Sequence, residues 1–395
     1  MTGQPHRSSP RSEGGEGRVA IMTWFSYCNY GTALQAVAMS RTIARLGYHP
    51  LFVSYDPEPA QRAAGNMKRS FAQRVIGKAR WILSPHPLVA KERDVAFAHF
   101  INANLDFTKP LSSDRLAELS GRFDAFVCGS DQIWSPRCFD ACYYLDFVND
   151  PQKKIAYAPS FGCDSIEEDE KARRIASLLR EFGSIAVREE SGANIVLELI
   201  GERPRVVLDP TLLLDSDTWS ELAGPCSVGE DPYCLFYFLG SHRGNKRAAQ
   251  RIAKLNGLRV LEIPVFENRQ GRPGVLGPDV GPAEFISLVR DASLVCTDSF
   301  HGMVFSTLFE KPFIPFERFS PNDSASQNTR VYNFLSLTGL EEILLTRSRL
   351  EDWRDYASPQ INYGNVGRRI EARRKDSMRY LRDALASATR CSISS

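Results

Sequence analysis

The chain has 395 residues, of which 43% are hydrophobic and 24% charged, and its formal net charge is +2 at pH 7. This length favours two domains over one, and the composition is typical of a globular protein. The near-neutral balance argues against a nucleic-acid partner, since dedicated nucleic-acid binders are normally strongly basic. We also expect no signal peptide, and no apolar run approaches the roughly 18 residues of a membrane helix.

Residues 1–17 are rich in Ser, Gly, Pro and charge, so we expect a disordered tail. Strands and helices then alternate, which predicts an α/β fold with parallel sheets covered by helices. Apolar runs predict strands near 19–22, 51–53, 123–128, 154–158, 185–187 and 206–208, with helices near 33–46, 171–181 and 192–199.

A second series of strands is predicted near 234–239, 258–263, 294–297 and 313–316. We therefore expect an N-terminal Rossmann-like domain at 18–215 and a C-terminal one at 216–364, facing each other across a cleft. A closing amphipathic helix at 365–388 is predicted to pack back across the junction between the domains.

A basic segment interrupts the first domain as an insertion at about 60–95. Six Lys and Arg residues and no acidic residue lie between Arg62 and Trp81, and its apolar residues fall on one helical face. Such a face can lie on anionic lipid, or its apolar side can simply pack on the N-terminal domain. The first alternative predicts peripheral contact with a membrane.

Three turns that follow predicted strands carry polar residues, at 28–35, 129–134 and 297–303. Ligands of open parallel α/β sheets bind at the carboxyl ends of strands, so three such turns indicate a built site. The third turn opens a helix, where backbone N–H groups and the helix dipole favour an anion. His301 in this turn can hold or deliver a proton near neutral pH. The alternative is that Asp298 or Ser299 caps the helix and His301 is a surface residue.

Six motifs along the chain resemble those of the polysaccharide pyruvyl transferase family, in the family's order and from about residue 18 to about 384. They are Asn-Tyr-Gly at 29–31, Gly-Ser-Asp-Gln-Ile-Trp at 129–134, Ala-Val-Arg-Glu-Glu-Ser at 186–191, Val-Leu-Asp-Pro-Thr-Leu at 207–212, Asp-Ser-Phe-His-Gly-Met at 298–303 and Asn-Thr-Arg-Val at 328–331. The resemblance implies a GT-B-like fold. It also implies transfer of a pyruvyl (carboxyethylidene) group from phosphoenolpyruvate to two hydroxyls of a sugar, which forms a cyclic ketal and releases phosphate.

The expected partners are therefore phosphoenolpyruvate as donor substrate and a sugar of a cell-surface or exopolysaccharide precursor as acceptor. Whether a lipid or a nucleotide carries the acceptor stays open at this point. We expect no cofactor, and no metal, because no carboxylate cluster has metal-ligand spacing. Nine cysteines without a C-x-x-C pair favour a reduced, cytoplasmic protein, with any membrane contact at the inner face.

The donor chemistry needs an acid and cations. His301 is our candidate general acid, because the enol carbon must be protonated before a hydroxyl attacks it. Arg188, at the end of a strand, and Arg330, at the start of a helix, are candidates for bidentate pairing with the anion. Each arginine could instead close a salt bridge, with Glu189 or Glu317 nearby in sequence.

Short polar groups in the turns are candidates for binding the substrates. Asp131 can serve as base for the attacking hydroxyl, or it can cap a helix. The remaining substrate-binding candidates are Asn29, Gly31, Ser130, Gln132, Ser299, Gly302 and His242. Two other functions stay open: a GT-B glycosyltransferase that uses a nucleotide sugar, and a non-catalytic saccharide-binding module.

Overall fold

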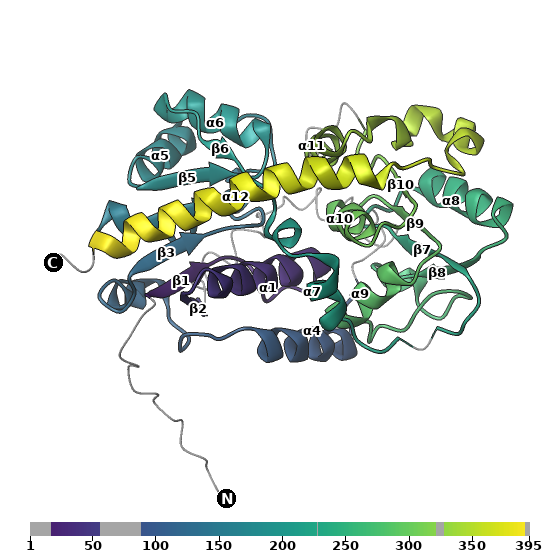
Figure 1. Ribbon diagram of the computed structural model, residues 1–395, viewed down its shortest axis with the longest axis horizontal. Coiled ribbons are helices and arrows are strands. Elements are labelled where there is room, and N and C mark those ends of the chain that lie inside the picture. Colours follow the sequence, from purple (N-terminus) through teal and green to yellow (C-terminus); the bar gives the residue numbers. More distant parts are fainter. Residues whose placement is uncertain (1–16, 56–87, 227, 321–327, 392–395) are drawn as a thin grey trace, which may run out of the picture.

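The computed structural model describes residues 17–55, 88–226, 228–320 and 328–391, and Figure 1 shows it in ribbon form. The predicted tail at 1–17 lies outside the described residues except for Gly17. The basic segment from Arg62 to Trp81 also lies outside them, so the structure does not test either alternative for it. The far end of the predicted insertion is described, and there helix α4 (Lys91–Asn104) begins.

The first half of the chain forms a parallel sheet of six strands, the N-terminal sheet, in the order β2-β1-β3-β4-β5-β6. Its central strands are buried on both faces, as expected of a parallel sheet covered by helices. The six predicted strands are confirmed, with small shifts at their ends. The strands are β1 (Arg18–Met22), β2 (His49–Phe52), β3 (Ala125–Cys128), β4 (Lys154–Tyr157), β5 (Ser184–Val187) and β6 (Arg205–Val206).

Helices cover both faces of this sheet. The first, α1 (Tyr30–Arg45), begins where the Asn29 side chain accepts hydrogen bonds from the amides of Gly31 and Thr32, and most of its residues are buried. A short 3-10 helix, η5 (Pro210–Leu213), follows β6 and packs against α1. The other helices of this half are α5 (Asp169–Leu179), α6 (Glu190–Ile200) and α7 (Ser216–Glu221).

The second half forms a parallel sheet of four strands, the C-terminal sheet, in the order β10-β9-β7-β8. The four predicted strands are confirmed as β7 (Tyr233–Tyr237), β8 (Arg259–Glu262), β9 (Leu294–Thr297) and β10 (Phe313–Pro315). Its helices are α8 (Arg243–Leu255), α9 (Pro282–Arg290), α10 (Phe300–Leu308) and α11 (Thr329–Thr338). The fold is α/β, with two Rossmann-like parallel sheets.

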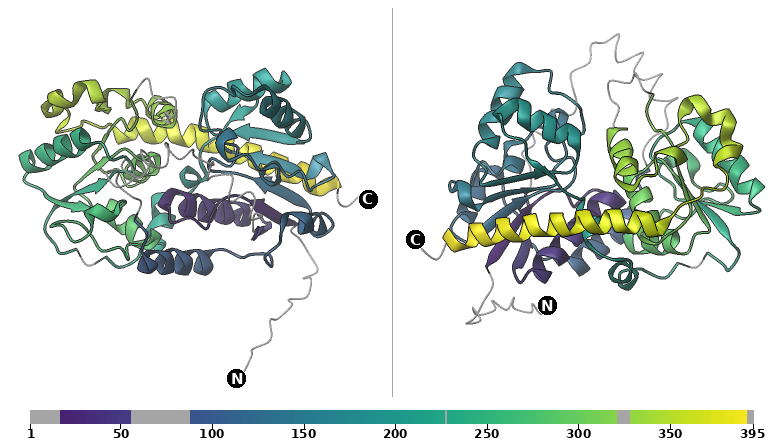
Figure 2. Two further views of the ribbon diagram at one scale, coloured as in Figure 1. Left: turned by 180° about the vertical axis from the view of Figure 1, so that it is seen from behind. Right: turned by 45° about the horizontal axis from the view of Figure 1, so that its top comes forward.

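The closing helix α12 (Tyr363–Cys391) runs across both halves of the molecule, in yellow in Figures 1 and 2. Near its start it packs on α11, and further along it contacts β3, β4 and η5. The Ser377 hydroxyl accepts a hydrogen bond from the Leu208 amide at 2.9 Å, and the Tyr380 hydroxyl donates to the Ala156 carbonyl at 3.0 Å. The prediction that this helix packs back across the junction is confirmed.

The two halves also meet directly through aromatic side chains. The Tyr30 ring of α1 stacks on Phe285 of α9 with ring centroids 4.6 Å apart, and its hydroxyl donates to the Val280 carbonyl at 2.8 Å. Arg93 of α4 donates to the Pro264 carbonyl at 2.6 Å. These contacts hold the carboxyl ends of the two sheets toward each other. In the part of the chain that the structure describes, no helix is both long and apolar enough to cross a membrane.

Candidate active site

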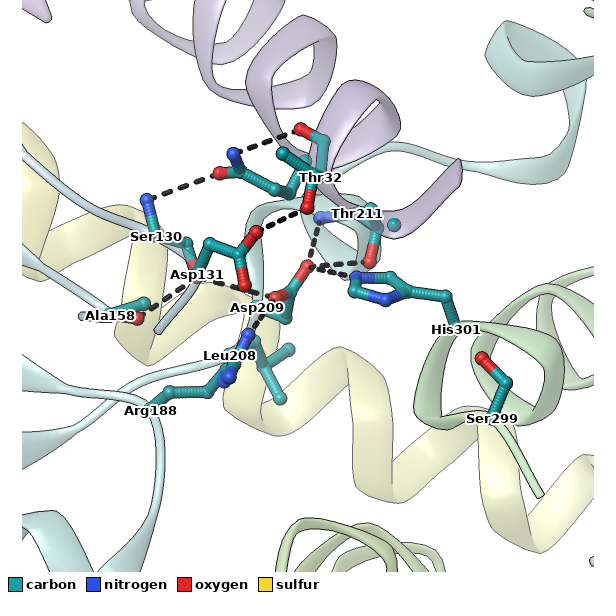
Figure 3. Close-up of polar contacts among 12 residues, drawn as sticks. Thr32, Ser130, Asp131, Ala158, Arg188, Leu208, Asp209, Thr211, Ser299 and His301 are labelled. Atoms are coloured by element: carbon teal, nitrogen blue, oxygen red, sulfur yellow. Dashed lines mark hydrogen bonds and ion pairs between the residues drawn. The ribbon is translucent and has the colours of Figure 1, made fainter. Parts of the chain in front are cut away.

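A buried carboxylate, Asp209, lies between residues of the two halves of the molecule, with His301 of the C-terminal half on one side (Figure 3). It caps η5, and its Oδ1 accepts hydrogen bonds from the Thr211 amide at 3.0 Å and the Thr211 hydroxyl at 2.7 Å. Its Oδ2 accepts from Arg188 Nη1 at 3.0 Å and from the Ser130 hydroxyl at 3.3 Å. The Nε2 atom of His301 lies 3.7 Å from Oδ1. One carboxylate therefore brings together three of the predicted site residues.

These neighbours stabilise the ionised form of the Asp209 carboxyl group. Burial by itself raises the pKa of this carboxyl group, but His301, Arg188 and Thr211 together lower it by more. The resulting pKa lies well below the ordinary value of an aspartate. Asp209 is therefore a permanent negative charge at neutral pH.

Arg188 follows β5 and is held from several sides. Its Nε donates to Glu189 at 3.2 Å and its Nη1 to Asp209, while its guanidinium carbon lies 5.3 Å from the centre of the Phe300 ring. Burial lowers the pKa of Arg188, but the two carboxylates raise it by more. Its Nη2 is buried and has no hydrogen-bond partner among the described residues. The salt-bridge alternative is therefore present, with Asp209 as a second partner beside Glu189, and the contact of Arg188 with an anion stays a prediction.

Arg330 stands in the first turn of α11, on the C-terminal side of the junction, and is largely buried. Burial, together with the positive charges of Arg188 and Arg318, lowers the pKa of Arg330 to about 9. Glu189 and Asp131 raise this pKa, but by less than burial and the two arginines lower it, so a further negative charge beside the guanidinium would be favourable. Two arginines from different halves of the molecule form a site suited to an anion.

A cavity of about 230 Å³ lies between the two halves beside these arginines. The N-terminal half lines it with Arg188, Glu189 and Asp209, and the C-terminal half with Phe300, Arg330 and Asn333. The Nδ2 atom of Asn333 is buried and, like Nη2 of Arg188, has no hydrogen-bond partner among the residues that the structure describes. Buried donors without acceptors are costly, so a ligand that accepts from them would be favoured.

His301 lies in the first turn of α10, beside the cavity wall rather than in it. Its ring lies so close to Gly31 that a Cβ atom built there would stand 1.9 Å from Nδ1. On its other side Nε2 faces Asp209 and has no hydrogen-bond partner within the described ranges. The imidazole is therefore enclosed between the start of α1 and the buried carboxylate, and it is not a surface residue.

Asp131 follows β3 and accepts a hydrogen bond from the Thr32 hydroxyl at 2.5 Å. Its negative charge raises the pKa values of both Arg188 and Arg330. Ser130 is fully buried and donates to the Ala158 carbonyl at 2.9 Å as well as to Asp209. Gln132 lies over Gly162, where a Cβ atom would stand 2.1 Å from its Nε2.

Four other predicted residues take part in helix caps. Ser299 caps α10 by accepting from the Gly302 amide at 3.3 Å, and Asn29 caps α1. His242 caps α8, with Nδ1 3.3 Å from the Asn245 amide, and its contacts do not join it to His301. Their roles in substrate binding stay predictions.

Sequence reasoning missed three residues that build the site. Asp209 and Asn333 line the cavity, and Gln35 accepts from the Ser130 amide at 3.1 Å while donating to the Trp24 carbonyl at 3.0 Å. The Asp-Pro-Thr sequence at 209–211 was a usable signal, because an aspartate before such a turn usually caps it. For Gln35 and Asn333 the sequence holds no local signal, since their neighbours in the site come from distant segments.

The family model of polysaccharide pyruvyl transferase matches residues 29–320. No curated protein sequence matches the chain. Among solved structures, a mutant O-GlcNAc transferase of Thermobaculum terrenum is 15% identical, with 98% of this chain and 71% of that chain covered and a TM-score of 0.43.

The N-terminal domain of the Candida albicans trehalose-6-phosphate phosphatase is 10% identical, with 97% of this chain and 100% of that chain covered and a TM-score of 0.49. The UDP-GlcNAc 2-epimerase of Neisseria meningitidis is 10% identical, with 90% and 97% covered and a TM-score of 0.42. The family match spans most of the chain and includes Asn29, Asp131, Arg188, Asp209 and His301. The chain belongs to the polysaccharide pyruvyl transferase family.

Proposed function

We propose that the protein transfers the carboxyethylidene group of phosphoenolpyruvate to two hydroxyls of a sugar in a cell-surface or exopolysaccharide precursor, and releases phosphate. The observation that carries the proposal is the cavity between the two halves, whose wall holds Arg188 and Arg330. Phosphoenolpyruvate is a compact anion with a phosphate and a carboxylate, which guanidinium groups bind bidentately. Family membership supports the reaction class.

The donor would lie in this cavity, and its negative charge would offset the repulsion among the arginines there. An anion beside Arg330 offsets the repulsion that this guanidinium experiences from Arg188 and Arg318. The unsatisfied donors Nη2 of Arg188 and Nδ2 of Asn333 would then find acceptors in the phosphate or the carboxylate. Asn333 follows Arg330 by three residues on α11, so both side chains lie on one helical face.

The transfer needs an acid and a base. His301 delivers a proton to the methylene carbon of the donor, which becomes a methyl group and leaves an electrophilic carbon next to the carboxylate. A sugar hydroxyl attacks that carbon as Asp131 accepts its proton. The bond between this carbon and the phosphate oxygen breaks, and the second hydroxyl closes the ketal. Of the two hydroxyl protons, one balances the proton placed on the methyl carbon and the other leaves with hydrogen phosphate.

The acceptor is proposed at the class level only, as a sugar with two suitably placed hydroxyls. Asn29, Ser130 and Gln132 belong to the turns that surround Asp131, where the attacking hydroxyl must lie. A cytoplasmic location, with contact to the inner membrane face through the segment at 62–81, belongs to the same proposal. That segment lies outside the described residues.

Phosphate release from phosphoenolpyruvate, measured against a panel of acceptor glycans, tests the proposal. We expect release that depends on both substrates, with the acceptor gaining the mass of a carboxyethylidene group. Release of a nucleoside diphosphate from a nucleotide sugar would instead identify a glycosyltransferase. Saccharide binding without either reaction would identify a binding module.

A further inference from the structure

The two oxygens of Asp209 serve different halves of the site. Oδ2 accepts from Arg188 at 3.0 Å and from Ser130 at 3.3 Å, and both of these residues follow strands of the N-terminal sheet. Oδ1 accepts from the amide and hydroxyl of Thr211 and faces His301, which belongs to the C-terminal half. The carboxylate is thus fixed by residues of its own half and presents one oxygen to the histidine of the other half.

The surroundings of His301 leave its ring little freedom. Its Nε2 has no hydrogen-bond partner among the described residues, and the charged group that it faces is Asp209, 3.7 Å away. The opposite edge of the ring lies against the bare Cα of Gly31. An approach of about 1 Å would bring Nε2 into hydrogen-bonding range of Oδ1.

We propose that Asp209 is a positioning residue for His301. It holds the imidazole in one orientation by facing the Nε2–H group, and its fixed negative charge compensates the ring while Nδ1 carries the second proton, which is the one to be delivered. A general acid oriented by a buried carboxylate is a recurring arrangement in enzymes. The role in proton delivery rests on the function proposed above, whereas the contact between carboxylate and ring does not.

The structure offers a matched control in Asp215. This carboxylate caps the short helix α7 and accepts from the amide and the hydroxyl of Thr218, just as Asp209 caps η5 and accepts from both groups of Thr211. It has no contact with Arg188 or His301. Asp215→Asn therefore reproduces the loss of a charged cap but not the loss of the carboxylate that faces the histidine.

The first experiment needs no substrate. The chain holds six histidines, so ring-nitrogen resonances can be followed by NMR after ¹⁵N-histidine labelling and assigned to His301 through a His301→Gln variant. We expect Asp209→Asn to change the ¹⁵N chemical shifts of the His301 ring, because the proton redistributes between the two ring nitrogens. Asp215→Asn should leave these chemical shifts unchanged. Unchanged His301 resonances in Asp209→Asn would overturn the proposal, whatever reaction the protein catalyses.

The second experiment is a double-mutant cycle on kcat. We expect Asp209→Asn to lower kcat at least about tenfold in the wild-type background but less than about twofold in a His301→Ala background, because its effect acts through the ring. KM for phosphoenolpyruvate serves as a separate measure of the contact with Arg188. An equal loss of kcat in both backgrounds contradicts the positioning role.

Asp209→Asn also removes the carboxylate that pairs with Arg188, and this loss can destabilise the folded protein. If that variant does not fold, Thr211→Val replaces it in the cycle, because it removes the hydroxyl that fixes Oδ1 and keeps the charge. If Thr211→Val lowers kcat by the same factor in the wild-type and the His301→Ala backgrounds, the proposal is again contradicted. If the wild-type protein releases no phosphate from phosphoenolpyruvate, the proposed reaction fails, and the NMR comparison still decides whether Asp209 orients His301.

Discussion

Arg188 is a buried side chain whose ion pairs use only part of its hydrogen-bonding capacity. Two of its nitrogens are used by Glu189 and Asp209, and the third, Nη2, remains for a ligand in the cavity. A lysine has a single ammonium group and cannot satisfy two carboxylates and a bound anion in this geometry. Arg330 approaches the same cavity from the other half of the molecule.

We expect Arg188→Lys and Arg330→Lys each to raise KM for phosphoenolpyruvate by roughly tenfold, although the charge is preserved, because the bidentate contact is lost. Steady-state kinetics with the donor varied measures this effect. Arg115→Lys is the control, since Arg115 pairs with Glu118 on the exposed surface and does not line the cavity. A donor KM equal to that of wild type in both variants would assign these arginines to structure alone.

We expect His301→Ala to fold normally and to lose turnover by roughly 10²–10⁴-fold, the usual contribution of a general acid. Circular dichroism checks the fold and phosphate release measures turnover. His242→Ala is the comparison, because His242 caps α8 and has no contact with Asp209. Wild-type kcat in His301→Ala, together with a large loss in His242→Ala, would exchange their assignments.

At the scale of elements, the start of α1 leaves space for a side chain from the other half of the molecule. Gly31 lies in the first turn of α1, and its missing side chain leaves the space in which the His301 ring lies. The backbone of Gly31 lies outside the left-handed region that favours glycine, so an alanine there is acceptable to the helix itself. The requirement for glycine comes from the neighbouring helix α10.

Gly31→Ala should therefore lower kcat by roughly 10²-fold, because a displaced catalytic group loses its geometry, while the fold is retained. Gly367→Ala is the matched control: Gly367 lies in α12, and a Cβ atom there meets no atom within 4 Å. We expect this control to keep full activity and to be slightly stabilised. Equal activity of the two variants would show that the ring of His301 moves aside without consequence.

Helix α12 satisfies backbone groups of the N-terminal half. The Ser377 hydroxyl accepts from the Leu208 amide, one residue before Asp209. Ser377→Ala leaves this buried N–H without its partner, which should cost about 1–3 kcal/mol in the free energy of unfolding, measured by urea denaturation. Thr389→Val, later in α12, replaces only a hydroxyl that donates to a carbonyl of its own helix, and we expect a much smaller change. A Ser377→Ala protein as stable as the control would contradict this account.

The sequence predicts these elements well where hydrophobic periodicity is strong. The strands of both sheets are short apolar runs, and the predicted helix at 365–388 is present as α12, extended at both ends. The extension begins near Asn362, whose side chain accepts from the Asn365 amide at 3.1 Å. Helix ends depend on such local hydrogen bonds, which periodicity does not reveal.

The candidate site was predicted only in part, for a physical reason. The turns at 129–134 and 297–303 are local features, so Asp131 and His301 could be singled out. Asp209 lay within a quoted motif, but its partners Arg188 and His301 are distant along the chain, and their meeting depends on how the two sheets pack. Ser299 caps α10, as the alternative interpretation of this turn predicted, and its role in substrate binding stays a prediction.

For the whole molecule, the pair of arginines at the cavity predicts that a bound anion increases the free energy of unfolding. The pKa of Arg330 is lowered to about 9 by burial and by its positive neighbours, so the unfolded chain holds this proton more tightly than the folded chain does. Below about pH 9 the folded protein therefore carries the full unfavourable charge of Arg330. A bound anion offsets this cost without requiring any change in the fold.

At pH 7, phosphoenolpyruvate at about 100 times its Kd should stabilise the protein by about 2.7 kcal/mol and raise Tm by on the order of 5 °C. Thermal melts at constant ionic strength measure the shift. Arg330→Met should lose most of it, whereas the exposed control Arg115→Met should retain it. A shift of the same size in Arg330→Met would place the anion elsewhere on the molecule.

The course of helix α12 also sets the order in which the protein becomes complete during synthesis. Domains generally fold from the N-terminal side as the chain leaves the ribosome. Here, however, the Leu208 amide and the Ala156 carbonyl of the N-terminal half bond to Ser377 and Tyr380 of α12, which is translated after both sheets. The first half therefore reaches its final state only after the second half has been made. In a ribosome-bound chain that still lacks α12, the Leu208 amide and the Ala156 carbonyl do not yet have these two partners.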